Sequence, residues 1–314
     1  MRVRVVGAGV IGLSCAIRLR EAGVDADVVA AATGSGTTSA AAAALWYPYL
    51  VGPADRVRDW GSAGFGELGR LAADPATGVR LRSGTELLRH ERPVPPWAAD
   101  VPGFRASAAV PPPYVAAWTF TAPVADTSVY LGWLAARLSR LGGTIRRAEV
   151  ATLDEAVHGV DVAVIATGIG ARLLPGDASV RPVHGQVVRV RAPGVRRWIL
   201  DEGHPDGMVY VVPRLDDVVC GGTDTEGFGP AEPDLAVGER ILRRCADVVP
   251  ELASARVLGA AVGIRPARPT VRVERIGDVV HCYGHGGAGF TLSWGCADDV
   301  RDLVLERPAG RTIR

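Results

Sequence analysis

Two glycine-rich segments, one near each end of the chain, restrict the folds open to it. The first reads Val-Val-Gly-Ala-Gly-Val-Ile-Gly at 5–12, and the second reads His-Cys-Tyr-Gly-His-Gly-Gly-Ala-Gly-Phe-Thr at 281–291. Glycines this close together carry no side chains that keep a ligand away, and they leave main-chain N–H groups free to bind it. We favour one cofactor held by both segments. For the second segment alone, a tight turn packed under a helix is the alternative.

The N-terminal segment has the pattern of strand, turn and helix. Residues 2–6 read as a buried strand, residues 10–21 have helical spacing, and residues 24–30 supply the next strand. The turn between the first strand and the helix fits G-x-G-x-x-G, with its glycines at Gly7, Gly9 and Gly12. Such a turn lets the backbone approach a pyrophosphate at the helix N-terminus. The sequence therefore predicts a Rossmann-type βαβ unit.

A carboxylate is missing where a dinucleotide-binding unit usually has one. That side chain binds the adenosine ribose hydroxyls from the end of the second strand, about 20 residues past the glycines. Here the place holds Ala30, Ala31 and Ala32, while Asp25 and Asp27 lie at the beginning of the strand. We expect no clamp for a 2′-phosphate and a loosely held adenosine, and the absence argues against a nicotinamide cofactor.

The composition excludes several classes of function. The chain has 314 residues, of which 48% are hydrophobic, so it can bury a substantial core. Its 35 basic and 34 acidic residues give a formal net charge of +1, and the arginines are scattered, which argues against a nucleic-acid partner. Five widely spaced cysteines and six histidines show no metal-ligand spacing, so we expect no metal and buried, reduced cysteines.

The sequence shows neither a leader nor a membrane span. It enters a strand at once, without a charged and then apolar signal region, and its longest apolar stretch, 40–46, is far too short to cross a bilayer. We expect a soluble cytoplasmic protein with no membrane partner. Whether the chain forms a homodimer stays open.

Hydrophobic periodicity predicts α/β architecture, with α+β character in a second domain. Helical spacing is found at 56–72, 128–141, 236–247 and 296–305, strand patterns are found at 160–166, 184–192 and 208–222, and proline-rich residues 93–113 indicate an irregular connection. We expect a nucleotide-binding domain of residues 1–46, 124–182 and 262–314, interleaved with a domain of residues 47–123 and 183–261.

Five motifs resemble one known family. They are Val-Val-Gly-Ala-Gly-Val-Ile-Gly-Leu-Ser (5–14), Leu-Trp-Tyr-Pro-Tyr (45–49), Tyr-Val-Val-Pro (210–213), Gly-Ile-Arg-Pro-Ala-Arg-Pro (263–269) and Tyr-Gly-His-Gly-Gly-Ala-Gly-Phe-Thr (283–291). In this order, along nearly the whole chain, they resemble the FAD-dependent D-amino-acid oxidase family. The resemblance implies a Rossmann-type domain that binds FAD non-covalently, and a substrate domain whose antiparallel β-sheet covers the flavin.

The resemblance also implies a reaction and its substrate-binding residues. The reaction is oxidative deamination of a neutral or basic D-amino acid by hydride transfer to flavin N5, with O₂ as acceptor, giving a 2-oxo acid, ammonia and H₂O₂. Arg265 and Tyr210 match the residues that bind the substrate carboxylate, and Gly287 matches the residue whose carbonyl accepts from the amino group. Tyr47, which replaces a glutamine of some relatives, is expected to border the pocket. None of these is a general base, so we expect the protein to supply orientation and electrostatics.

Further residues are expected to contact FAD. They lie in both glycine turns, in the small-residue stretch before the Leu-Trp motif, and after the strand at 160–166. They are Gly7, Ala8, Gly9, Val10, Ile11, Gly12, Thr37, Thr38, Ser39, Ala43, Ala44, Leu45, Thr167, Gly168, Gly286, Gly287, Ala288, Gly289, Phe290 and Thr291. Without the motifs, Arg265 would equally fit a structural ion pair, Tyr210 a packed strand aromatic, and residues 33–44 a flexible loop.

Three other functions stay open. A D-aspartate oxidase would need a second cation for the side-chain carboxylate, and Arg214, Arg268 and His204 are the available residues. A glycine or sarcosine oxidase would need a smaller or differently walled pocket. Outside enzymes, the alternative is a flavin-free binding protein that has lost its ribose-binding carboxylate.

Overall fold

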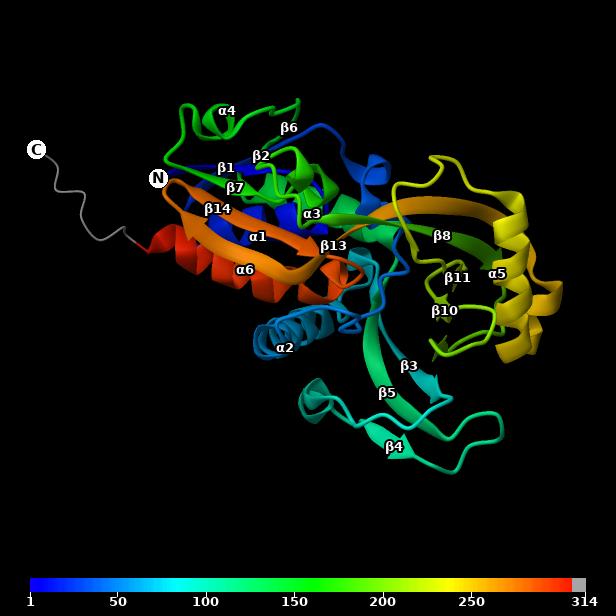
Figure 1. Ribbon diagram of the computed structural model, residues 1–314. Helices are drawn as coiled ribbons and strands as arrows, with labels where there is room; N and C mark the ends of the chain where they lie inside the picture. Colours follow the sequence, from blue (N-terminus) through cyan, green and yellow to red (C-terminus); the bar gives the residue numbers. More distant parts are fainter. Residues whose placement is uncertain (307–314) are drawn as a thin grey trace, which may run out of the picture.

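A single mixed β-sheet of 14 strands runs through the whole molecule (Figure 1). The computed structural model describes residues 1–306, so the end of the predicted segment 262–314, from 307 onward, lies outside the described residues. The sheet has a parallel half, which carries the first glycine turn, and a half that is antiparallel apart from the parallel pair β3 and β9. This confirms the predicted fold class. The domain boundaries stay a prediction, since one continuous sheet joins the two halves.

The parallel half has the Rossmann arrangement. From its edge inward it contains β6 (Ile145–Arg147), β2 (Asp25–Ala30), β1 (Arg2–Val6), β7 (Val162–Ile165) and β14 (Val279–His285). In the centre, Val5 of β1 lies opposite Val28 on one side and Val164 on the other. All three valines are fully buried, because helices cover both faces of a sheet of this kind. The carboxyl ends of β1, β2 and β7 therefore meet at one edge, where the first glycine turn begins.

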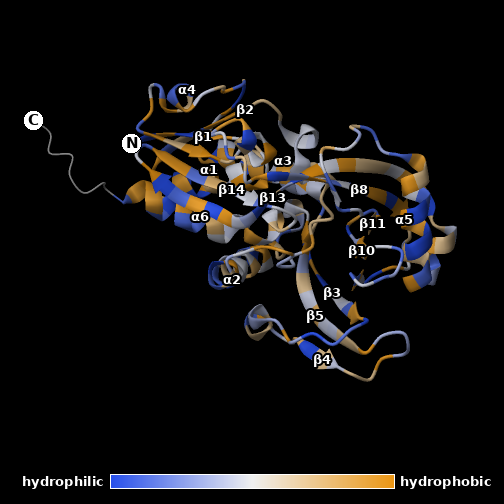
Figure 2. Ribbon diagram, viewed as in Figure 1, coloured by the Kyte–Doolittle hydropathy of each residue, from blue (hydrophilic) through white to orange (hydrophobic). Residues whose placement is uncertain are grey.

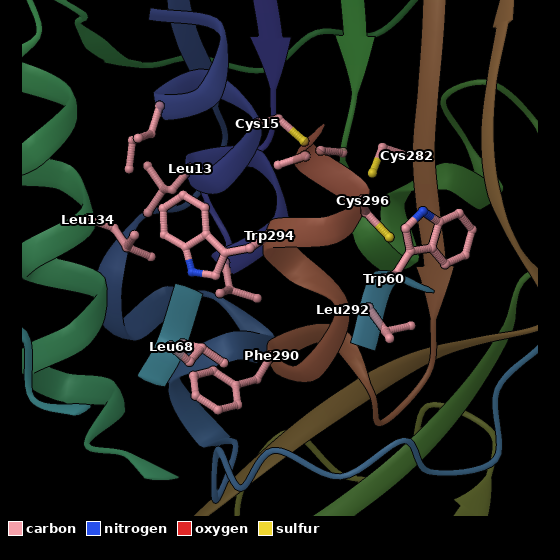
Figure 3. Packing of buried hydrophobic residues seen from close by; sticks show 14 of the residues in the cluster. Leu13, Cys15, Trp60, Leu68, Leu134, Cys282, Phe290, Leu292, Trp294 and Cys296 are labelled. Atoms are coloured by element: carbon pink, nitrogen blue, oxygen red, sulfur yellow. The ribbon is translucent and has the colours of Figure 1, made fainter. Parts of the chain in front are cut away.

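Three helices cover one face of the parallel half: α1 (Val10–Glu21), α3 (Thr127–Arg140) and α6 (Gly289–Leu305) (Figure 1). Helix α2 (Ala54–Leu71) packs on α6, and the short helix α4 (Leu153–Val157) lies on the other face of the sheet. Figure 3 shows Trp294 of α6 beside Leu13 of α1 and Leu134 of α3. The Trp294 indole donates to the Tyr130 hydroxyl at 2.9 Å. This core fixes the N-termini of α1 and α6 at the same edge of the sheet.

The helix α6 begins seven residues earlier than the predicted 296–305. Its first two turns contain Gly289 and Gly295, which weaken the helical signal. Gly295 is nonetheless required, since a Cβ there would lie 2.4 Å from the Trp60 Cα of α2. The glycine allows the two helices to approach each other closely.

In the antiparallel half, one face of the sheet is turned toward the parallel half and helix α5 covers the other face. Its central strands are β8 (Arg181–Arg191), β11 (Val218–Gly221), β10 (Val209–Pro213) and β9 (Trp198–Asp201), and β12 (Thr225–Glu226) pairs with β8. Helix α5 (Leu235–Val248) packs Ile241 and Cys245 against the outer face. Figure 2 shows both hydrophilic and hydrophobic residues on α5, as expected for a helix that covers a sheet.

One long strand joins the two halves. Strand β13 (Arg256–Ile276) pairs antiparallel with β8 over Arg256–Ala267 and then with β14, with a register shift between Ala267 and Arg272 (Figure 1). Arg265 therefore lies near the junction of the halves. β13 begins before the motif at 263–269, and together with β14 it forms the strand pair that leads into the second glycine turn.

The sheet ends in a region where the sequence predicted no strand. Strands β3 (Val79–Leu88) and β5 (Ala116–Ala125) pair over ten residues each, β3 also pairs with β9, and β4 (Arg105–Ser107) lies within the connection expected to be irregular. Short 3₁₀ turns occupy Gly34–Gly36, Thr38–Ala41, Pro75–Thr77, Pro96–Asp100, Gly168–Arg172 and Pro250–Ser254. The sequence pattern does not predict β5, because the strand contains several alanines and Pro123, and both residue types are uncommon in strands.

All five cysteines are buried and unpaired by disulfides, as predicted. Cys15, Cys282 and Cys296 lie close together between α1, β14 and α6 (Figure 3). Within residues 1–306, none of the helices combines the length and apolar character needed to cross a bilayer.

Candidate active site

A cavity of about 810 Å³ lies where the carboxyl ends of the parallel strands meet the inner face of the antiparallel sheet. Both glycine turns line it, as do Arg265 of β13 and Tyr210 of β10. Segments separated by more than 200 residues thus form one site, as the two glycine-rich segments indicated. Such a position, outside the carboxyl ends of parallel strands, is typical of nucleotide-binding sites.

Two helix N-termini point at this cavity, and neither N-cap residue has a side chain that caps its helix. Gly9 is the N-cap of α1 and Ala288 is the N-cap of α6, neither makes a side-chain cap hydrogen bond, and neither helix has an acid in its first turn. Ser39 accepts a hydrogen bond from Val10 N at 3.0 Å, which ties the small-residue stretch to α1. Uncapped N–H groups and the helix dipole favour a negatively charged ligand here.

Ala30, Ala31 and Ala32 line one end of the cavity, and Glu149 lies beside them. Strand β6 pairs with β2, and Ala148 N donates to Ala30 O at 3.0 Å, which carries the chain past the alanines. Glu149 is exposed and has no ion pair in the described part of the chain. A carboxylate is therefore present at this end, although it comes from the loop after β6 and not from the end of β2.

Arg265 has the geometry of an anion-binding group. Its guanidinium lies against Gly185 of β8, where a Cβ would be 2.5 Å from Nη1 and 2.6 Å from Cζ. Nη1 donates to Thr223 O at 2.7 Å, and no carboxylate lies within ion-pair distance among residues 1–306. The ion-pair alternative for Arg265 is therefore wrong for the described residues. A half-buried arginine without a counter-ion favours binding of a carboxylate from outside the chain.

Tyr210 lies beside Arg265 over two glycines. A Cβ on Gly221 would be 2.0 Å from Tyr210 Cζ, and one on Gly222 would be 2.4 Å from Cε1, so the ring lies flat on this backbone. Burial raises the pKa of the Tyr210 hydroxyl, and the nearby Arg265 guanidinium opposes this shift only in part. The hydroxyl therefore stays protonated and can donate a hydrogen bond.

Gly287 lies between Arg265 and a second tyrosine. A Cβ at this position would be 3.0 Å from Tyr49 Cδ1 and 3.8 Å from Arg265 Cδ. Burial raises the pKa of Tyr49, with Glu202 adding to the shift and Arg265 opposing it, so the phenol is protonated as well. Arg265, Tyr210, Tyr49 and Gly287 form one cluster on the cavity wall.

Tyr47 lines the cavity as predicted, but its polar atoms are occupied elsewhere. Its hydroxyl donates to Glu86 Oε2 at 2.5 Å, and its main-chain N and O each bond Thr291 Oγ1 at 3.0 Å. Its ring meets that of Trp97 edge to face. Tyr47 therefore forms part of the wall and packs against it, whereas the hydroxyl of Tyr49, two residues later, has no hydrogen-bond partner among residues 1–306.

Most residues expected to contact FAD line the cavity. They are Gly7, Ala8, Gly9, Val10, Ile11, Thr37, Thr38, Ser39, Ala43, Ala44, Leu45, Thr167, Gly168, Gly286, Gly287, Gly289 and Phe290. Gly12, Ala288 and Thr291 lie behind the wall. Gly12 allows α1 to approach the turn, because a Cβ there would be 1.9 Å from Gly7 O, and Thr291 holds Tyr47. Ala288 is fully buried, so these three positions support the wall without forming it.

None of the three suggested extra cations reaches the cavity. Arg214 pairs with Asp217 at 2.7 Å, Arg268 pairs with Asp177 at 3.0 Å, and His204 lies in the loop after β9. Arg265 is the one arginine on the described cavity wall. The described residues thus offer no second cation for a substrate with two carboxylates.

Four residues of the site were not found from the sequence. Tyr49 belongs to the Leu-Trp-Tyr-Pro-Tyr motif and could have been considered with Tyr47. Gly185 and Glu149 carry no local signal, because each reaches the cavity through the pairing of strands distant in sequence. Glu202 follows β9, a short strand that the sequence did not predict.

Comparisons with known proteins agree with this geometry. The family model described as FAD dependent oxidoreductase matches residues 2–303. The chain is 49% identical to a D-amino-acid oxidase of Rubrobacter xylanophilus (96% of this chain, 95% of the relative) and 41% identical to a D-amino-acid oxidase of Streptomyces coelicolor (96% of each). A glycine oxidase structure from Geobacillus kaustophilus matches with a TM-score of 0.79 at 21% identity, covering 96% of this chain and 94% of that one.

Proposed function

The chain belongs to the family of FAD-dependent oxidoreductases, and from this premise we propose that it is a D-amino-acid oxidase. It converts neutral and basic D-amino acids to 2-oxo acids and ammonia while O₂ is reduced to H₂O₂. The observation that carries this function is the Arg265 guanidinium, which lies in the cavity beside Tyr210 with no carboxylate partner among residues 1–306. A substrate carboxylate is the partner that fits.

The cavity wall fits FAD. The N-termini of α1 and α6 would face an anionic dinucleotide, since their helix dipoles favour negative charge. Gly9 and Gly287 leave room at the cavity wall, because a Cβ at either position would lie 3.0 Å from Ser39 Oγ or Tyr49 Cδ1. The turn after β1 and the N-terminus of α1 would hold the pyrophosphate, and residues 286–290 would hold the flavin end. Bound FAD would supply the oxidation, taking two electrons from the substrate and passing them to O₂.

Substrate orientation is the task of the chain's own residues. The bond from Arg265 Nη1 to Thr223 O fixes the guanidinium plane and leaves its other N–H groups for the substrate carboxylate. The Tyr210 hydroxyl donates to the same carboxylate, since it stays protonated. The Gly287 carbonyl accepts from the substrate amine. Three fixed contacts around the α-carbon set the direction of its C–H bond, and such positioning lowers the barrier without a general base.

Tyr210→Phe should weaken substrate binding moderately. The change removes one hydroxyl from a carboxylate that Arg265 still holds, so we expect a loss of about 1 to 2 kcal/mol, seen mainly as a higher KM. Steady-state kinetics with D-alanine measure it. Tyr114→Phe is the control, because its hydroxyl bonds Asp201 at 3.1 Å and its ring lies off the cavity wall. If Tyr210→Phe were more damaging than Arg265→Ala, the roles of the two residues would be wrong.

Glu149 should contribute to FAD affinity in place of a carboxylate at residue 31. Glu149→Gln is expected to weaken FAD binding by about 1 to 2 kcal/mol, because it removes a partly exposed charge-assisted hydrogen bond to the ribose hydroxyls. This loss corresponds to about a five- to thirtyfold increase in Kd. Ala31→Glu should tighten binding by a similar factor and reduce the effect of the Gln substitution. Fluorescence titration of apoprotein with FAD measures both. Equal affinity of Glu149→Gln and the unchanged chain would show that other groups satisfy the ribose.

The proposed activity can be tested with a peroxide-coupled screen of amino acids. The protein, supplied with FAD, is assayed with D- and L-alanine, D-lysine, D-aspartate and glycine. We expect turnover of D-alanine and D-lysine and none of L-alanine. Preference for D-aspartate or for glycine would assign the chain to one of the alternative oxidases. Absence of flavin absorbance even after addition of FAD would favour a flavin-free binding protein.

A further inference from the structure

The hairpin between β9 and β10 brings a carboxylate into the cavity that the proposed function leaves unused. Leu200 of β9 pairs with Tyr210 of β10, so side-chain alternation puts Glu202 on the cavity side with Leu200. Asp201 points to the other face, where it pairs with Arg89 at 2.8 Å. Apart from Glu149 at the adenosine end, Glu202 is the only acid on the cavity wall that the structure describes.

Glu202 shares its counter-ion with a second, buried carboxylate. Arg92 Nη1 donates to Glu202 at 3.2 Å, and Arg92 Nη2 donates to Glu86. Glu86 is fully buried and also accepts from the Tyr47 hydroxyl at 2.5 Å. Between residues 1 and 306, neither carboxylate has another arginine within ion-pair distance. Burial raises the pKa of the Glu86 carboxyl to about 7, so near neutral pH this group is only partly ionised. To the extent that both carboxylates are ionised, one guanidinium faces two negative charges, and the excess negative charge lies beside the cavity.

This charge is opposite to that of the group that binds the substrate carboxylate. Arg265 and Glu202 form no ion pair with each other in the described chain, and Arg92 bonds only Oε2 of Glu202, which leaves Oε1 for a ligand. Both act on Tyr49: after burial, Glu202 is the next largest cause that raises the pKa of this phenol, and Arg265 lowers it. The cavity therefore matches a molecule with a carboxylate at one end and a cation at the other.

We propose, building on the proposed function, that Glu202 is a specificity-determining residue that favours D-amino acids with a cationic side chain, such as D-lysine or D-arginine. Its carboxylate binds the distal ammonium or guanidinium group, while Leu200 and Met208, which also line the cavity, contact the aliphatic stem. The same charge disfavours D-aspartate and D-glutamate, because a second carboxylate would meet Glu202.

The test compares D-lysine with D-norleucine, which has the same chain length without the charge. The ratio of their kcat/KM values is measured for the FAD-loaded enzyme, for Glu202→Gln, for Glu202→Asp and for Glu91→Gln. Glu91 is exposed and lies off the cavity wall, so its substitution is the matched removal of one charge. We expect Glu202→Gln to lower the ratio of kcat/KM for D-lysine to kcat/KM for D-norleucine by about ten- to hundredfold, because the substitution removes a hydrogen bond between charged groups. Glu202→Asp should keep part of the preference, and Glu91→Gln should keep all of it.

The outcomes separate this proposal from the function on which it rests. Oxidation of D-norleucine with a ratio unchanged in Glu202→Gln would overturn the role of Glu202 and leave the oxidase activity in place. An equal fall in Glu91→Gln would show a general charge effect and would overturn the role too. Oxidation of neither amino acid by the unchanged chain would overturn both.

Discussion

Arg265→Ala should lower kcat/KM for D-alanine by about a hundredfold or more while the protein still folds and binds FAD. Charge-assisted hydrogen bonds contribute roughly 1.5 to 3 kcal/mol each, and the substrate carboxylate would be left unpaired in the cavity. A loss of about 3 kcal/mol in transition-state binding corresponds to about this factor in rate. Steady-state kinetics together with the flavin absorbance spectrum measure the two properties separately.

Two further variants make the Arg265 result specific. Arg181→Ala removes an arginine of β8 whose side chain is 59% exposed and pairs weakly with Glu226 at 3.7 Å, and it should leave the kinetics unchanged. Arg265→Lys keeps the charge but loses the planar fork, so its activity should lie between those of the arginine and alanine forms. Near-normal turnover by Arg265→Ala with a normal flavin spectrum would remove Arg265 from the site.

Gly185→Ala should have the second largest effect, although it adds one methyl group and touches no substrate. The new Cβ would lie 2.5 to 2.6 Å from three guanidinium atoms of Arg265. The guanidinium must therefore move, and its hydrogen bond to Thr223 O is disturbed. A displacement of about 1 Å at such a group costs about a hundredfold in rate. The fold should tolerate the change, since the atoms that move form the end of a flexible side chain.

Gly194→Ala is the matched control for this substitution. Gly194 follows β8 in the chain, and a Cβ there meets nothing within 4 Å. Thermal unfolding should show both variants folded, and only Gly185→Ala should lose activity. Full activity of Gly185→Ala would mean that the observed Arg265 orientation does not matter for turnover.

The sequence predicts those parts of the fold that depend on short-range patterns. Residues 2–30 form the expected βαβ unit, because apolar alternation, helical spacing and the glycine turn all lie within one contiguous stretch. Arg265 and Tyr210 were found through motifs of a family, and no physical pattern in either segment would have distinguished them from ordinary strand residues. The structure adds why they meet, because β13 and β10 both belong to the sheet face that closes the cavity.

The rest could not be predicted because it depends on the order of strands. Glu149 reaches the adenosine end only because β6 pairs with β2, a strand far away in the sequence. Gly185 has its role because β8 lies beside β13, where the Arg265 side chain crosses it. A chain pattern contains no information on such neighbours. The sequence has no carboxylate at residue 31, but the adenosine end of the cavity still has one, because strand pairing brings Glu149 there.

Anaerobic mixing of the FAD-loaded protein with the two enantiomers of alanine and with D-alaninamide tests whether this cavity oxidises D-amino acids held by their carboxylate. The visible flavin absorbance is followed through a single turnover. D-Alanine should bleach it completely and L-alanine should leave it unchanged. D-Alaninamide lacks the carboxylate, so it should react more slowly by about the hundredfold expected for Arg265→Ala. Equal bleaching by both enantiomers, or equal rates for D-alanine and its amide, would contradict the account.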